Sequence, residues 1–162
     1  MYDENNPSLV VDYAQLAGQA GALRHGEPSL IANAANFAAL LFHSIPDLNW
    51  AGWYVVRGDW LVVGPFQGRP ACIRIARGDG VCGTAWATGI SQRVDDVLQF
   101  PGHIPCDSAS RSELVVPLFA AGVVRAVLDL DSPKPGRFTA QDQAGLENLA
   151  AAFAADADWA QL

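Results

Sequence analysis

The first part of the chain carries two apolar stripes with the period of a helix. The first stripe is formed by Leu9, Tyr13, Leu16, Ala20 and Leu23. The second is formed by Leu30, Ala34, Phe37 and Leu41. This spacing predicts two amphipathic helices, the first ending near Gly26. The second begins near Pro28 or Ser29 and stops before Pro46, because proline cannot continue a helix.

From Asn49 onward the apolar period changes to that of strands. The short polar segment Arg57-Gly58-Asp59 interrupts two apolar runs. The apolar residues on its two sides are Trp53, Val55, Trp60, Val62 and Val63. A glycine between two such runs predicts a hairpin. A further strand is expected over residues 71–75. A glycine-punctuated loop is expected over residues 78–83.

The last third of the chain predicts a second hairpin and a closing helix. Strands over 114–119 and 123–130 are joined at Ala120-Ala121-Gly122. Thr139 and Asp142 have the spacing of a capping box and open a helix. That helix carries Leu146, Leu149, Ala150 and Phe153. Hairpins imply antiparallel strands, so the chain is expected to form one α+β domain over residues 1–162, with residues 1–8 disordered.

Composition narrows the class of protein. The 162 residues carry 10 Lys and Arg against 17 Asp and Glu, which gives a formal charge of −7. A field of that sign repels phosphate backbones and argues against nucleic-acid binding. No apolar run approaches the roughly 18 residues of a membrane helix, and the acidic start MYDENNPS is unlike a secretory signal. We therefore expect a soluble cytoplasmic domain that does not bind membranes.

The cysteines and histidines give no sign of a metal site. The three cysteines, Cys72, Cys82 and Cys106, are an odd number and contain no C-x-x-C pair, so a structural zinc site is disfavoured. For a single cysteine, a buried apolar role is the simplest interpretation. The histidines, His25, His43 and His103, have no common spacing and are interpreted as structural or solvent-facing.

Cys106 lies in a polar loop, GHIPCDSASRSE, just before a predicted strand. Small hydroxyl residues and Arg111 surround it in the sequence. A cysteine in such a loop can be exposed and partly ionised, as a nucleophile must be. The alternative is a loop cysteine without a role.

The segment VLDLD, residues 127–131, places two carboxylates on one strand face. Asp129 and Asp131 share that face, and the leucines between them point the other way. A neighbouring strand can add Glu113. Such a group suits a bound cation or ammonium group, or one carboxyl group kept protonated as an acid. The alternative is a solvated strand end.

Aromatic residues alternate in NWAGWY, residues 49–54. Trp50, Gly52 and Tyr54 share one strand face, and Trp53 takes the other. Two aromatic rings with a small residue between them can form a cup for a methyl or thioether group. A plain apolar core is the alternative.

These segments, taken together, resemble the free methionine-(R)-sulfoxide reductases, which are single GAF domains. The similar segments are NWAGWY, LVVGPFQGRPACIRI, GDGVCGTAWATG, FPGHIPCDSASRSELVVPLF and VLDLDSP, in the same order. They run from Asn49 to Pro133. Two residues depart from the family pattern. Trp86 stands where a smaller residue is expected, and Ile90 stands where an acidic residue is expected. Both departures concern the shape of a loop that covers the site.

The resemblance implies a six-stranded antiparallel sheet and a set of site residues. Cys106 is similar to the nucleophile, Cys72 to the main resolving thiol, and Cys82 to a third cysteine that can join a disulfide relay. Trp50 and Tyr54 match the aromatic wall around the substrate methyl group. The acidic residues that hold the substrate correspond to Glu113, Asp129 and Asp131.

The implied activity is the reduction of free methionine sulfoxide to methionine. A protonated carboxyl group activates the sulfoxide, a thiolate attacks its sulfur, and the resulting sulfenic acid condenses with a second thiol. The family implies thioredoxin as the external reductant, supplied by NADPH, with no bound cofactor, and a homodimer. The alternatives are a GAF domain that senses a small molecule without catalysis, and a thiol redox sensor.

Overall fold

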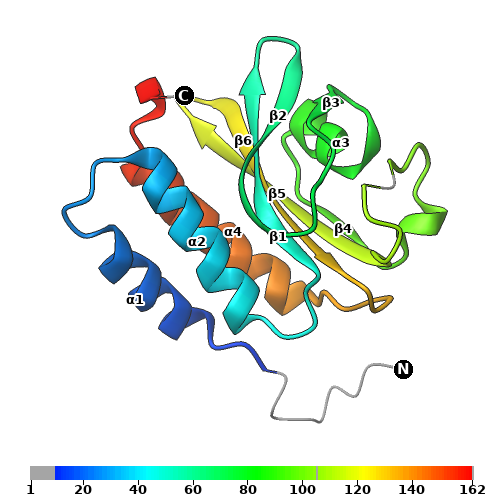
Figure 1. Cartoon of the computed structure of the whole chain (residues 1–162), viewed down its shortest axis with the longest axis horizontal. Helices are drawn as coiled ribbons and strands as arrows, with labels where there is room; N and C mark the ends of the chain where they lie inside the picture. Colours follow the sequence, from blue (N-terminus) through cyan, green and yellow to red (C-terminus); the bar gives the residue numbers. More distant parts are fainter. Residues whose placement is uncertain (1–9, 105, 162) are drawn as a thin grey trace.

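The centre of the molecule is one sheet of six strands in the order β3-β2-β1-β6-β5-β4 (Figure 1). The computed structural model describes residues 10–104 and 106–161. The elements are α1 (Tyr13–Arg24), α2 (Leu30–Ser44), β1 (Trp50–Arg57), β2 (Trp60–Gly68), β3 (Arg74–Ala76), α3 (Gly80–Thr88), β4 (Gln92–Val94), η2 (Val97–Gln99), β5 (Ser112–Ala120), β6 (Val123–Ser132), α4 (Ala140–Asp156) and η3 (Trp159–Gln161). All strand pairs are antiparallel, so the predicted α+β class and six-stranded sheet are confirmed.

Helices α2 and α4 begin where the sequence predicts, whereas α1 begins at Tyr13, four residues after the first residue of the expected apolar stripe. Asp12 caps α1, and Ser29 caps α2. At α4 the Thr139 and Asp142 side chains form the expected capping box. Leu9 and the segment 1–8 lie outside the described residues. None of the described helices combines the length and hydropathy needed to cross a lipid bilayer.

Both predicted hairpins are present. β1 pairs with β2 around the turn at Gly58, and β5 pairs with β6 around Ala121 and Gly122. The two hairpins join through β1 and β6, which places Trp50 opposite Asp131 and Gly52 opposite Asp129. The aromatic and the acidic segment therefore lie side by side at the centre of the sheet.

The structure corrects the bounds of two expected segments in the middle of the chain. The strand expected over 71–75 begins only at Arg74, so Cys72 belongs to the loop before β3. The loop expected over 78–83 contains the start of α3, which begins at Gly80. Glycine has a low helix propensity, so the local sequence does not favour a helix here. Packing of Val81 and Trp86 against the sheet stabilises α3 nevertheless.

The sheet separates two apolar cores. Trp53, Leu128 and Leu130 pack against α1, α2 and α4 on one face. Trp50 and Tyr54 pack on the other face with α3 and the loops around it. Strand alternation thus assigns neighbouring residues of β1 and β6 to different cores, as the sequence predicts.

Candidate active site

A pocket lies on the α3 face of the sheet. Its walls come from β1, the loop before β3, the start of α3, the loop before β5, and strands β5 and β6. The residues that the sequence singles out in this pocket are Trp50, Tyr54, Cys82, Cys106, Glu113, Asp129 and Asp131. Cys72 borders it through its disulfide partner Cys106. The fold therefore brings together every predicted site residue.

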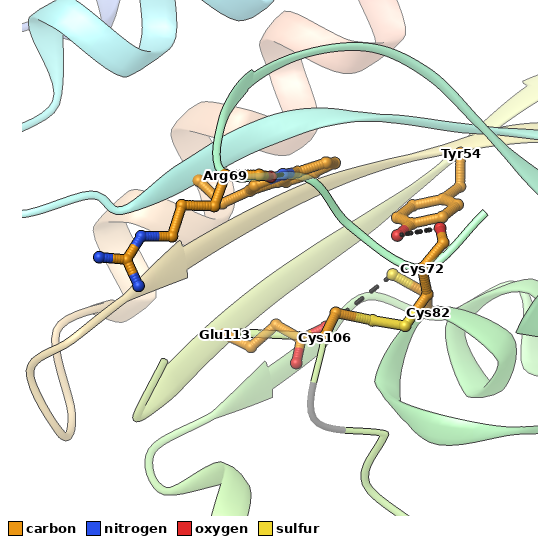
Figure 2. The surroundings of a disulfide bond; sticks show 7 residues. Tyr54, Arg69, Cys72, Cys82, Cys106 and Glu113 are labelled. Carbon is orange, nitrogen blue, oxygen red and sulfur yellow. Dashed lines mark hydrogen bonds between the residues drawn. A yellow bond between two sulfur atoms is a disulfide. The ribbon is translucent and has the colours of Figure 1, made fainter. Parts of the chain in front are cut away.

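Cys72 and Cys106 form a disulfide at the edge of the pocket (Figure 2). Their Cα atoms are 5.5 Å apart, although 34 positions separate them in the sequence. The Tyr54 hydroxyl donates a hydrogen bond of 3.0 Å to the Cys72 carbonyl oxygen, which fixes the Cys72 loop against β1. Both cysteines are only partly buried, so a reductant in solution can approach the bond.

Cys82 is a free thiol on the buried side of α3. Its exposed fraction is 3%, and its Sγ donates a hydrogen bond of 3.8 Å to Oε1 of Glu113. Burial, and then the nearby carboxylates of Asp129 and Glu113, raise the pKa of the Cys82 thiol well above its ordinary value. Cys82 is therefore a protonated thiol, poorly suited to attack a substrate.

Thiol labelling tests this description of Cys82. The oxidised native protein is expected to react with an aromatic disulfide reagent at no cysteine, because Cys82 is buried and the other two are joined. After unfolding in denaturant without reductant, one thiol per chain becomes reactive. Reduced, unfolded protein provides the control and gives three. A rapid reaction of the native oxidised protein would contradict the buried position of Cys82.

Glu113, Asp129 and Asp131 form a carboxylate cluster at the base of the pocket. Glu113 on β5 lies directly opposite Asp131 on β6, and Asp129 is two residues away on the same face. Asp129 is 5% exposed, and its buried Oδ1 has no hydrogen-bond partner among the residues that the structure describes. A solvated strand end, the alternative considered for this segment, is therefore wrong for Asp129.

Burial controls the protonation of the carboxylate cluster. It raises the pKa of Asp129 to about 7. Burial is also the largest cause for Glu113 and Asp131, whose pKa values the neighbouring carboxylates raise further. The cluster therefore retains protons at neutral pH and can act as a proton donor.

Trp50 and Tyr54 form an aromatic wall of the pocket. Their ring centroids are 5.8 Å apart and the rings are stacked. Phe66 of β2 extends the wall, with its ring 5.2 Å from that of Trp50. Gly52 permits this packing, since a Cβ at that position would lie 2.7 Å from the Trp50 ring. The sequence does not indicate Phe66, because its contact with Trp50 depends on the register of β2.

Asn49 holds the loop that carries Cys106, a role that the sequence did not indicate. Its Nδ2 donates to Oδ2 of Asp107 at 3.2 Å and to Oγ of Ser110 at 3.0 Å. Its backbone N–H donates to the carbonyl oxygen of Asp131. The one feature of the sequence that could have indicated this role is the position of Asn49 directly before the aromatic segment.

The structure also places three other residues that the sequence singled out. His103 lines the pocket and is half-buried. Trp86 is buried on α3, below the Arg77 guanidinium, and Ile90 is exposed just after that helix. Neither residue lines the pocket.

The described fold is that of a GAF domain. The family model for the GAF domain matches residues 37–155. The free methionine-R-sulfoxide reductase of Escherichia coli (strain K12) is 51% identical over 139 residues, covering 86% of this chain and 84% of that protein. The chain belongs to the family of free methionine-R-sulfoxide reductases, which are oxidoreductases.

Solved structures of the same family are similar throughout. The fRMsr of Staphylococcus aureus in complex with substrate is 41% identical, with a TM-score of 0.86, covering 91% of this chain and 96% of that chain. The free methionine-R-sulfoxide reductase from Neisseria meningitidis in complex with its substrate is 38% identical, with a TM-score of 0.89. That match covers 99% of this chain and 96% of the Neisseria chain.

Proposed function

We propose that the protein reduces free L-methionine-(R)-S-oxide to L-methionine by thiol chemistry. The observation that carries this proposal is a disulfide at the edge of a pocket that also contains buried, protonated carboxyl groups and an aromatic wall. Sulfoxide reduction needs a thiol, a proton donor and an apolar surface for the methyl group. The names of the relatives support the substrate and the R epimer.

The first step is attack of the Cys106 thiolate on the sulfoxide sulfur. A carboxyl group of the cluster protonates the sulfoxide oxygen, because sulfur is a poor electrophile until that oxygen is protonated. The oxygen then passes from the substrate sulfur to the sulfur of Cys106, the transient bond between the two sulfurs breaks, and methionine leaves, so that Cys106 carries the oxygen as a sulfenic acid. Cys106 is suited to this role because it is partly exposed, whereas Cys82 is buried.

The second step joins Cys106 to Cys72. The Cys72 thiol condenses with the sulfenic acid, water leaves, and the Cys72–Cys106 disulfide forms. Thioredoxin, reduced by NADPH, then exchanges its dithiol for this disulfide and restores both thiols. No bound cofactor takes part. Cys82 provides a further thiol for the relay, 3.8 Å from Glu113. We place this cycle in the cytoplasm, where such a reductant keeps thiols reduced, and we infer a homodimer from the family.

The carboxylate cluster also selects a free amino acid. An ammonium group is stabilised by buried carboxylates, and the unpartnered Oδ1 of Asp129 offers it an acceptor. A methionine sulfoxide residue within a peptide has no such ammonium group, except at the N-terminus. The cluster therefore favours free methionine sulfoxide, with Trp50 and Tyr54 against the methyl group.

The test is NADPH consumption with thioredoxin and its reductase. We expect turnover of free methionine-R-sulfoxide, and none of the S epimer or of an internal methionine sulfoxide in a peptide. Equal turnover of free and peptide-bound sulfoxide would contradict the selectivity. If folded, reduced protein turns over neither epimer, the protein is a GAF sensor instead, and a bound small molecule becomes the object of study.

A further inference from the structure

Cys82, Glu113 and Asp129 converge on one point inside the pocket. The thiol comes from α3, and the two carboxylates come from β5 and β6. One ligand atom of each lies within 4.8 Å of the other two. The three residues are 3%, 7% and 5% exposed. Three separate elements thus present a sulfur and two oxygens to the same small volume.

We propose that these three residues bind one zinc ion, and we call them the Cys82 site. Zinc bonds to thiolate sulfur at about 2.3 Å and to carboxylate oxygen at about 2.0–2.2 Å, so tetrahedral ligands of the two kinds are about 3.6 Å apart. The distance from Cys82 Sγ to Glu113 Oε1 is 3.8 Å. The side chains therefore need little movement to reach the metal.

A buried oxygen of Asp129, Oδ1, is a second observation in favour of a cation at this point. This oxygen is buried and accepts no hydrogen bond within the described residues. A buried acceptor without a donor is costly, which is why such groups are rare. A metal ion at the Cys82 site would satisfy this oxygen directly.

None of the described Lys or Arg side chains lies at the Cys82 site. Among the described residues, Arg69 is the one Lys or Arg side chain that lines the pocket. It is 77% exposed and lies 3.9 Å from Asp107, at the outer edge. No fixed cation among the described residues therefore competes with a metal ion that replaces the protons of Glu113 and Asp129.

The ligand set selects the kind of metal. One sulfur and two oxygens suit zinc or cadmium, whereas magnesium requires six oxygen ligands in an octahedron. Three protein ligands leave a fourth position on the pocket side for water. Binding releases the protons that the thiol and the carboxyl groups hold, at most one per ligand, and transfers no electrons.

Zinc at the Cys82 site would switch the enzyme off reversibly. The metal occupies the carboxylates that bind the substrate ammonium group and donate the proton, so zinc and substrate compete. This consequence rests on the proposed function, whereas the binding of the metal does not. Zinc would then inhibit turnover, and a chelator would restore it.

Cadmium binding to the oxidised protein is the decisive measurement. Cys82 is the free thiol of that form, and a cadmium–thiolate bond gives a charge-transfer band in the ultraviolet. We expect the band to saturate at one cadmium per chain and to be absent from Cys82→Ala. Asp129→Asn and Glu113→Gln should each weaken binding by about 100-fold or more. Asp59→Asn, in the exposed β1–β2 turn, is the matched control and should bind as the wild type does.

Two results of the cadmium measurement would overturn the proposal. Absence of the band, or equal cadmium affinity in wild type, Asp129→Asn and Glu113→Gln, would show that no such site exists. Circular dichroism establishes that each variant is folded. Calorimetric titration of the wild type with zinc, and with magnesium as a control, gives a second readout that needs no variant. Neither readout uses substrate, so failure of the proposed function leaves this test intact.

Discussion

Replacement of Cys106 by serine is expected to lower turnover of free methionine-R-sulfoxide by about a thousandfold or more. A serine hydroxyl is a far weaker nucleophile than a thiolate at neutral pH, and it cannot accept the sulfoxide oxygen as a sulfenic acid. The carboxylate cluster and the aromatic wall remain, so the variant should still bind substrate. The measurement is steady-state NADPH consumption, together with substrate binding by calorimetry.

Cys72→Ser is the matched control for this substitution, because it removes the same disulfide and leaves Cys106 in place. If Cys106 is the nucleophile, the Cys72→Ser variant should release about one methionine per chain in a single turnover. A carbon nucleophile such as dimedone, present during this turnover, traps the sulfenic acid on Cys106 before Cys82 condenses with it, and mass spectrometry locates the adduct. Turnover by Cys106→Ser, or trapping at Cys82 in Cys72→Ser, would contradict the assignment.

Asp129→Asn is expected to lower kcat/KM by about 10²- to 10⁴-fold, the range for loss of a positioned acid. The amide is nearly the same size as the carboxyl group, so the pocket keeps its shape. It has no acidic proton, so it cannot protonate the sulfoxide oxygen. Asp59→Asn, in the exposed turn, should leave kcat/KM unchanged. Wild-type kcat/KM in Asp129→Asn would remove Asp129 from the mechanism.

The pH profile distinguishes proton donation by Asp129 from binding alone. Burial raises the pKa of Asp129 to about 7, so the protonated donor predominates below that pH and is lost above it. Wild-type kcat/KM, measured with a chelator present, is therefore expected to fall as the pH rises through about 7. Asp129→Asn should not show this fall. An unchanged fall in the variant would assign the proton to another group.

The sequence specifies the regular parts of the fold well, because local periodicity and packing agree there. Leu30, Ala34, Phe37 and Leu41 share one helical face, and all four are buried in the structure. The β5–β6 hairpin follows from its turn and its alternation. Capping of α4 by Thr139 follows from the spacing to Asp142. In each element the signal lies within a few residues.

The middle of the chain was harder to predict because its structure depends on distant contacts. Helix α3 has glycines at its start, and packing of Val81 and Trp86 on the sheet stabilises it. The contact of Phe66 with Trp50 depends on the pairing of β1 with β2, which is irregular between Gly52 and Tyr54. No local pattern encodes such a contact.

The identity of the candidate site residues could be predicted from the sequence, whereas their arrangement in space could not. Alternation placed Asp129 and Asp131 on one face without revealing that burial would keep the cluster protonated. The pairing of Cys72 with Cys106 came from the family resemblance, since spacing alone does not fix it. The approach of Cys82 to Glu113 emerged only from the packing of α3 against β5.

The alternation of β6 also restricts where the gene can gain or lose codons. Leu128 and Leu130 face the helices, and Asp129 and Asp131 face the pocket. An insertion or deletion of one residue within the strand would exchange these faces, placing carboxylates in the apolar core and leucines in the pocket. Length differences between homologous genes should therefore gather at exposed turns such as Ala121-Gly122, which also makes that turn suitable for inserting a reporter peptide.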